Sequence, residues 1–142
     1  MDKDLLKCAD QALRYLSLRE HNRRELSLKL RNKGYEEDII RRTLDCLEED
    51  GSLSEQRYVE AYVRSSNNRH PEGRSVMMAR LLSKGADRDV CRSVLDNIYN
   101  DEYVCALVMR ASAKKDRIGL LKAGFTSADI AKYMLSKSDE LE

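Results

Sequence analysis

The segment LRNKGYEEDII, residues 30–40, is the most informative part of the sequence, because the chain repeats its pattern twice more. The other two copies are LLSKGADRDVC at residues 81–91 and LLKAGFTSADI at residues 120–130. In each copy an apolar residue stands four positions before a glycine, and apolar positions then recur at helical spacing. A glycine at this place is typical of the left-handed residue that ends one helix before the next begins. The pattern therefore predicts three pairs of helices, each joined by a tight turn.

A further amphipathic helix is expected before each pair, over residues 4–18, 54–68 and 102–113. Ser54 is the expected N-cap of the second of these helices. The residues expected to face inward are Leu5, Leu6, Ala9, Ala12, Leu13 and Leu16 in the first helix, and Tyr58, Val59, Ala61, Tyr62 and Ser65 in the second. The third pair is expected to have a short leading helix, over residues 116–123.

The repeats together predict an all-α protein with about nine helices in an elongated, curved arrangement. The expected domain limits are residues 1–51, 52–100 and 101–137, followed by a polar tail at 138–142. Each repeat is too small to bury its apolar face alone, so neighbouring repeats are expected to stack. The scarcity of chain-breaking residues agrees with helices, since the chain has one proline and six glycines.

Composition excludes several classes of function. The net charge is only +1, so no strong overall field draws the chain to DNA or to anionic membranes. No apolar run reaches the length of a membrane span, and the start does not resemble a signal peptide, so a cytoplasmic protein with no membrane partner is expected. The four cysteines are expected to be buried or half-buried reduced thiols: Cys8, Cys46, Cys91 and Cys105.

The sequence contains no recognisable catalytic set. Neither His21 nor His70 has a nucleophile and an acid beside it, and no phosphate-binding glycine loop or metal motif is present. We therefore expect a protein that is not an enzyme and that has no cofactor and no bound metal. The acidic run at residues 48–50 closes a predicted helix, where negative charge is unfavourable. A solvated helix end is the favoured interpretation, and a partner-facing surface or a basic neighbour is the alternative.

Basic residues are segregated along the chain. Residues 14–33 hold seven Lys and Arg against two Asp and Glu, whereas residues 34–55 hold two against eight. On a helical wheel Arg24, Leu28 and Arg31 lie opposite the core positions, which makes them a candidate contact with phosphates or an acidic protein surface. A solvated face is the alternative. A helix-turn-helix reader of DNA sequence is disfavoured, because its recognition helix would begin with three acids.

With these residues in view, the sequence resembles the RecX family, bacterial regulators of the RecA recombinase. The resemblance is dense from about residue 9 to residue 96 and thinner as far as Leu135. The segments that carry it are ALRYLS at 12–17, RRELSLKLRNKG at 23–34, LDCLEEDGSLS at 44–54, RYVEAYVR at 57–64 and the LLSKG motif that ends at Gly85. In the third repeat the basic pair that often precedes the Gly-Phe of the family is Lys122-Ala123, so this repeat departs from the pattern.

The resemblance implies three-helix repeats and a regulator, mainly an inhibitor, that binds in the groove of the RecA filament on single-stranded DNA. Such binding would lower ATP hydrolysis and strand exchange and favour disassembly of the filament. The implied partners are RecA and DNA, single-stranded first and double-stranded second, with the chain acting as a monomer. The basic positions that the resemblance assigns to RecA or DNA are Arg19, Arg23, Arg24, Lys29, Arg31, Arg64, Arg69, Arg74 and Arg80.

Two other interpretations stay open from the sequence. The chain could be a DNA-binding helical module that acts without a filament partner, or a helical-repeat adaptor for another protein. A steep salt dependence on bare DNA would favour the module.

An elongated arrangement makes a testable prediction about size in solution. A compact globule of 142 residues has a radius of gyration of about 14–15 Å. Three repeats in a row should give a larger value in small-angle X-ray scattering at low protein concentration. A value at or below that of the compact globule would contradict the elongated arrangement.

Overall fold

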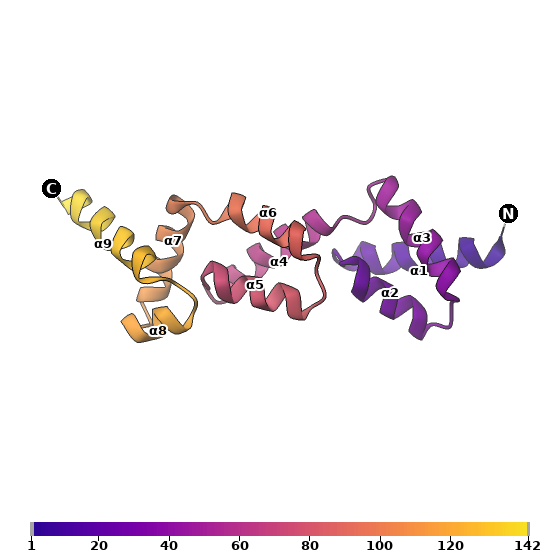
Figure 1. Cartoon of the computed structure of the whole chain (residues 1–142), viewed down its shortest axis with the longest axis horizontal. Coiled ribbons are helices and arrows are strands. Elements are labelled where there is room, and N and C mark those ends of the chain that lie inside the picture. The colour runs from indigo at the N-terminus through magenta and orange to yellow at the C-terminus, as the bar shows by residue number, and fades with distance from the viewer. Residues whose placement is uncertain (1, 142) are drawn as a thin grey trace.

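The computed structural model describes residues 2–141, and within them the chain forms nine α-helices and no strands. Figure 1 shows the helices in three groups along an elongated row, with the two ends of the chain far apart. We call these groups unit 1 (α1–α3), unit 2 (α4–α6) and unit 3 (α7–α9). The helices are α1 Lys3–Leu18, α2 Arg23–Asn32, α3 Glu37–Glu49, α4 Glu55–Arg69, α5 Arg74–Ser83, α6 Arg88–Ile98, α7 Asp101–Ser112, α8 Arg117–Lys122 and α9 Ser127–Leu141.

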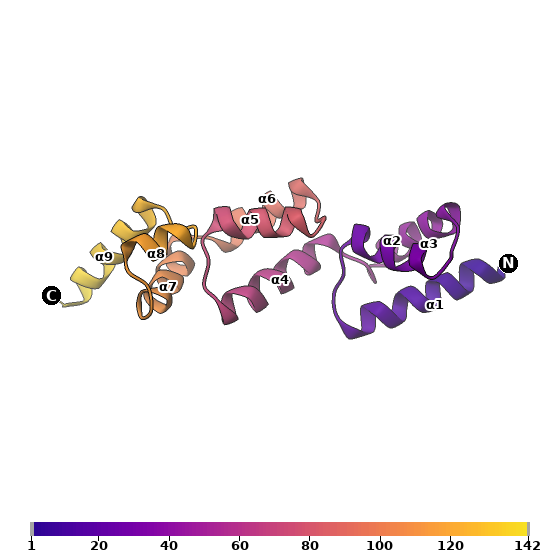
Figure 2. The ribbon, with the colours of Figure 1, turned by 90° about the horizontal axis from the view of Figure 1, so that it is seen from below.

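Each unit has its own apolar core. In unit 1 all three helices contact one another, and in units 2 and 3 the first and third helices pack together. Figure 2 shows α1 and α4 along one side of the row, with α2, α3, α5 and α6 on the other. The largest fully buried side chains include Leu26, Leu30, Ile40 and Leu44 in unit 1, Met77, Leu81 and Leu95 in unit 2, and Val108 and Phe125 in unit 3.

The turns that follow the second helix of each unit confirm the prediction from the repeated glycine. Gly34, Gly85 and Gly124 have φ values of 96°, 90° and 99°, which lie in the left-handed region that favours glycine. Helix starts agree as well, since Ser54 caps α4 by accepting a hydrogen bond from the Arg57 amide at 3.2 Å.

Some side-chain predictions are wrong. Leu6 and Leu13 of α1 are exposed, because the other two helices of unit 1 cover a narrower stripe of α1 than its apolar residues occupy. Ser65 is exposed, and Val63 and Ser66 of α4 are buried in its place. Cys46 is also exposed, because it lies outside the stripe of α3 that faces the core.

The third unit departs from the repeat pattern at one core position. The glycine alignment pairs Met134 with the buried Leu44 and Leu95, but Met134 is 56% exposed. Tyr133, its neighbour on α9, packs against the core of unit 3 instead. Part of the expected polar tail at 138–142 continues α9, which extends to Leu141; residue 142 lies outside the described residues.

The contacts between units are of two kinds. Units 1 and 2 meet through polar groups, described below, and their apolar cores share no residue. Units 2 and 3 share Tyr99, which packs against both cores. The Asn67 amide donates to the Tyr99 and Tyr103 hydroxyls at 3.0 and 2.8 Å, and Tyr99 donates in turn to the Glu72 carbonyl. Burial raises the pKa of Tyr99, so its hydroxyl keeps this proton at neutral pH.

Among residues 2–141, none of the helices is long and apolar enough to cross a lipid bilayer.

The close packing around Gly73, at the junction between units 2 and 3, predicts that a methyl group added there destabilises the protein. Gly73 has an ordinary φ of −75°, but a Cβ on it would lie 2.1 Å from the carbonyl oxygen of Gly124. Gly73→Ala should therefore lower the free energy of unfolding by about 1–3 kcal/mol through overpacking, as measured by urea denaturation. The same variant should also break the hydrogen bond from the Gly73 amide to the Ala123 carbonyl, which is 2.8 Å long.

Gly34→Ala is the matched control for this prediction. Its φ is positive but nothing lies within 4 Å of the added Cβ, so it tests backbone strain without a clash. Gly34→Ala should leave the junction between units 2 and 3 intact. Equal proteolytic resistance of that junction in the two variants would contradict the steric explanation.

Candidate functional site

An open groove of about 1070 Å³ lies where unit 1 meets unit 2. Its walls come from α2, the α3–α4 connection, the first turn of α4 and the α5–α6 turn. It contains the three residues that the helical wheel assigned to the outer face of α2. The lining residues are Arg23, Arg24, Ser27, Leu28, Arg31, Glu48, Gly51, Leu53, Ser54, Glu55, Gln56, Arg57, Gly85, Asp87 and Val90.

A carboxylate that lines the groove joins the two units. The two oxygens of Glu55 accept hydrogen bonds from the Arg23 amide at 2.6 Å and from the Asp87 amide at 3.1 Å. Both amides belong to helix starts, α2 and α6, where backbone N–H groups lack partners inside the helix and favour negative charge. One side chain at the start of α4 therefore ties a helix of unit 1 to a helix of unit 2.

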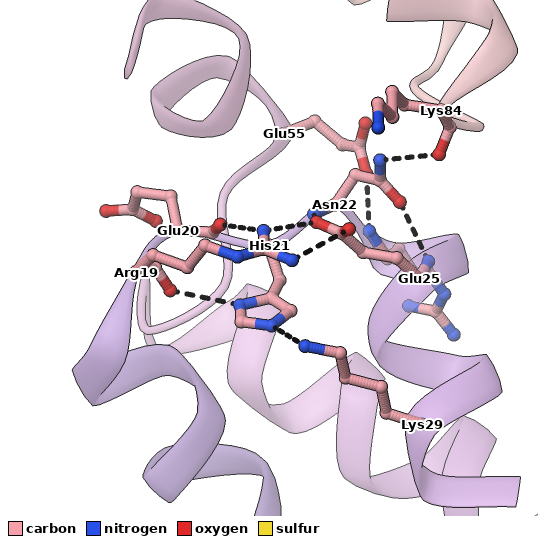
Figure 3. A network of polar contacts seen from close by, with 9 residues as sticks. Arg19, Glu20, His21, Asn22, Glu25, Lys29, Glu55 and Lys84 are labelled. Atoms are coloured by element: carbon pink, nitrogen blue, oxygen red, sulfur yellow. Dashed lines mark hydrogen bonds and ion pairs between the residues drawn. The ribbon is translucent and has the colours of Figure 1, made fainter. Parts of the chain in front are cut away.

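Asn22 adds a second tie between the units, as Figure 3 shows. Its side-chain amide donates to the Lys84 carbonyl at the end of α5, at 3.1 Å. Its side-chain oxygen accepts from the backbone N–H of Glu25 at 2.8 Å, and the Glu25 carboxylate accepts from the backbone N–H of Asn22 at 3.0 Å. This reciprocal arrangement is a capping box that starts α2.

The cations of the groove differ in whether a carboxylate of the chain pairs with them. Arg23 forms ion pairs with Asp45 and Glu48, both at 2.8 Å, and this explains the acidic end of α3. Arg31 is paired with Glu37, and Arg57 with Glu20 at 3.0 Å. All these pairs are at least partly exposed, so each contributes about 1 kcal/mol or less and can exchange for another anion.

Arg24 is the groove cation without a carboxylate partner among the described residues. The stem of its side chain lies against Gly85, where the missing Cβ makes room for it. Leu28, one turn further along α2, is 45% exposed in the same groove. The outer face of α2 thus presents a free guanidinium beside an exposed aliphatic side chain.

The other predicted site residues lie outside this groove. Arg19 is paired with Glu25, Arg74 with Asp96 and Arg80 with Glu72, at 2.9, 2.6 and 2.8 Å. Arg64 lines a separate groove between α4 and α6, and Arg69 lies exposed in the last turn of α4. The structure therefore brings together Arg23, Arg24 and Arg31 and leaves the rest apart.

Two of these ion pairs occupy equivalent places in the repeat. Arg23–Asp45 in unit 1 and Arg74–Asp96 in unit 2 both join the start of the second helix to the third helix. Such pairs support the packing of each unit, so these two arginines have a structural role in addition to any contact with a partner.

Lys29 is engaged inside unit 1. Its ammonium lies 2.8 Å from His21 Nε2 and 5.0 Å from the centre of the Tyr15 ring. His21 is buried, and its Nδ1 lies 3.0 Å from the Arg19 carbonyl (Figure 3). Burial lowers the pKa of His21, so the ring is neutral, with Nδ1–H donating to the carbonyl and Nε2 accepting from Lys29.

Sequence reasoning missed three residues that line the groove or tie the two units together beside it. Asn22 carries a signal that could have been used, since Asn-x-x-Glu before a helix is a capping pattern. Glu55 and Arg57 carry no such signal, because their partners at residues 23, 87 and 20 are distant in sequence.

A row of three-helix units joined end to end defines this chain as a helical-repeat protein. The family model for the first three-helix domain of RecX matches residues 8–47. The chain is 31% identical to the regulatory protein RecX of Chlorobium phaeobacteroides over 114 residues, which cover 80% of this chain and 73% of that protein. The crystal structure of RecX from Lactobacillus salivarius superposes with a TM-score of 0.75 at 27% identity, covering 96% of this chain and 97% of that one. The chain belongs to the RecX family.

Relatives differ in how much of their length is matched. For the regulatory protein RecX of Halorhodospira halophila the identity is 34%, over 78% of this chain and 65% of that protein. The chain spans about half the length (47%) of the regulatory protein RecX of Clostridium perfringens, at 31% identity.

The neutral state of buried His21 predicts a pH dependence of stability. In the unfolded chain its pKa is near 6.5, so below that pH the unfolded state binds a proton that the folded state does not. This contribution is fully present above about pH 6.5 and is lost as the pH falls further. From about pH 6.5 to about pH 5.5 the free energy of unfolding should decrease, by at most about 1.4 kcal/mol per pH unit.

Urea denaturation at several pH values measures this slope, and His21→Gln should flatten it. The matched control is His70→Gln, which changes an exposed histidine and should keep the slope. The lowered pKa of Glu25 acts in a more acidic range and does not overlap this window. Identical slopes in the wild type and His21→Gln would disprove the assignment.

Proposed function

We propose that this chain regulates the RecA recombinase, mainly as an inhibitor, by binding in the groove of the RecA filament on single-stranded DNA. Membership of a family whose members are named regulatory protein RecX supports this role. The observation that carries it is the outer face of α2, where unpaired Arg24 and exposed Leu28 lie in an open groove between two units. A free cation can bind phosphate or an acidic protein surface, and an aliphatic neighbour adds contact specificity.

The elongated row of units suggests how such a regulator acts. A rod can lie across several subunits of a polymer, bridging neighbours or blocking addition at a growing end. It changes ATP hydrolysis, strand exchange or assembly only if it binds one arrangement of the filament more tightly than another. In this proposal the chain acts as a cytoplasmic monomer and has no catalytic role of its own.

The nine basic residues then fall into three groups. Arg24, Arg64 and Arg69 have no carboxylate partner among the described residues and can bind directly, whereas Lys29 would first have to leave His21 and Tyr15. The others must exchange an internal ion pair for the partner: Arg19, Arg23, Arg31, Arg74 and Arg80. Exchange is least costly for exposed pairs such as Arg31–Glu37.

The test is ATP hydrolysis by RecA from the same organism, assembled on single-stranded DNA, while this chain is titrated at two salt concentrations. A fall at sub-equimolar amounts is expected, because few binders would control many subunits. No fall, despite binding to bare DNA, would replace the proposal with the DNA-binding module. No effect and no DNA binding would favour an adaptor for another protein.

Arg24→Glu combined with Arg31→Glu should raise the concentration needed for half-inhibition about tenfold, equivalent to about 1.4 kcal/mol of binding free energy. Lys7→Glu combined with Arg14→Glu is the matched control. This pair has the same spacing on α1, one member unpaired and the other in an ion pair with Asp10, and produces the same net charge. Equal inhibition by the two variants would remove the α2 face from the proposal.

A further inference from the structure

A second basic surface lies where unit 3 meets unit 2. Its six cations are all exposed, and they come from the end of α4, the end of α7, the α7–α8 turn and α8. We call this the junction surface, and its members are Arg69, Arg110, Lys114, Lys115, Arg117 and Lys122. Only Arg69 belongs to the positions that the family resemblance assigned to RecA or DNA.

Contacts between the two units bring these residues together. The Arg110 guanidinium donates to the Asn68 carbonyl at 3.2 Å, which places the end of α7 beside the end of α4 and so beside Arg69. The Gly73 amide donates to the Ala123 carbonyl at 2.8 Å, which places the end of α8, with Lys122, against the α4–α5 connection. The stem of Lys115 packs over Gly119, whose missing side chain leaves room for it.

The junction surface carries an excess of positive charge. Among the described residues, none of its six cations forms an ion pair, whereas ten of the other 18 Lys and Arg residues before residue 101 do. The acids nearby are already engaged. Asp116 caps α8 through the Gly119 amide, Asp129 caps α9 through the Thr126 amide, and Glu72 holds Arg80.

Exposed aliphatic side chains lie among the cations. Ile118 and Leu121 of α8 are 63% and 41% exposed, and Arg117 and Lys122 flank them in the chain. Cations meet phosphates in any nucleic acid, but a duplex keeps its base faces stacked inside. A single strand can turn its bases outward, where aromatic side chains and arginine planes stack on them and apolar side chains can also cover their faces. The combination therefore fits a single strand better than a duplex.

We propose that the junction surface binds single-stranded DNA, with its cations on the phosphates and with Ile118 and Leu121 against the bases. This proposal rests on the proposed function and deepens it. The junction surface would bind the DNA strand of the filament, and the α2 face of unit 1 would form a separate contact with the filament. The site needs units 2 and 3 together, because its cations come from both.

The experiment measures binding of the full chain to a fluorescein-labelled single strand by anisotropy, at salt concentrations from about 0.05 to 0.2 M. Lys114→Gln, Lys115→Gln and Lys122→Gln are combined in one variant. Each lost phosphate contact reduces the slope of log affinity against log salt by about 0.7, so three should reduce it by about 2 and weaken binding roughly 100-fold at 0.1 M salt. The matched control combines Lys3→Gln, Lys7→Gln and Lys33→Gln, which removes three lysines elsewhere that have no ion pair among the described residues, and it should keep the slope.

A second variant tests the apolar part. Ile118→Ala with Leu121→Ala should lower affinity for the single strand at an unchanged salt slope, and should have less effect on binding to a duplex of the same sequence. Circular dichroism confirms that the variants keep their helices.

The proposal is overturned if the wild type does not bind the single strand, or if the control reduces the slope as much as the junction variant. It is also overturned if the junction variant loses inhibition of RecA but keeps its DNA slope, because the surface would then meet protein. Inhibition of RecA by the wild type, measured in parallel, keeps the two proposals separate: it can persist when the junction surface fails.

Discussion

The backbone carbonyls at the ends of α5 and α8 hold the three units in a row. The last carbonyls of a helix have no partner inside it, and here they accept hydrogen bonds from the preceding unit. Lys84 accepts from the Asn22 side chain, and Ala123, at the equivalent place in the next unit, accepts from the Gly73 amide. The turn that ends each of these helices is thus also the point of contact with the preceding unit.

The glycines after these carbonyls end their helices and also leave room for the neighbouring unit. Gly85 and Gly124 adopt the left-handed conformation, and their missing Cβ atoms leave space for Arg24 and Val76 of the preceding units. Gly34 has the same conformation with open space around it, so conformation alone explains that residue. One residue type in the repeat therefore satisfies a local backbone requirement everywhere and a packing requirement only at the junctions.

The junction between units 1 and 2 is polar, whereas the junction between units 2 and 3 buries apolar area. Between units 1 and 2 the contacts are polar, through Glu55 and Asn22, and polar contacts exchange with water at little net cost. Between units 2 and 3 the ring of Tyr99 is shared by both cores, so burial of apolar area holds the units together. Cations near the first junction are largely engaged in ion pairs, whereas those of the second have none within the part of the chain that the structure describes. A net charge of +1 therefore conceals two basic surfaces of different character.

Sequence patterns alone predict the helical class, the turns at the three glycines, the Ser54 cap and the outward face of α2. These follow from local rules of backbone conformation and helical periodicity, and both can be read within a few residues. Tertiary structure decided what depends on distant partners: the Glu55 bridge, the pairing of Arg23 and Arg74, the exposure of Leu6 and Met134, and the gathering of Arg69 with Lys114 and Lys122. Which side of a helix is covered, and which charge is neutralised, depends on where the other units lie, and no periodicity within one helix contains that information.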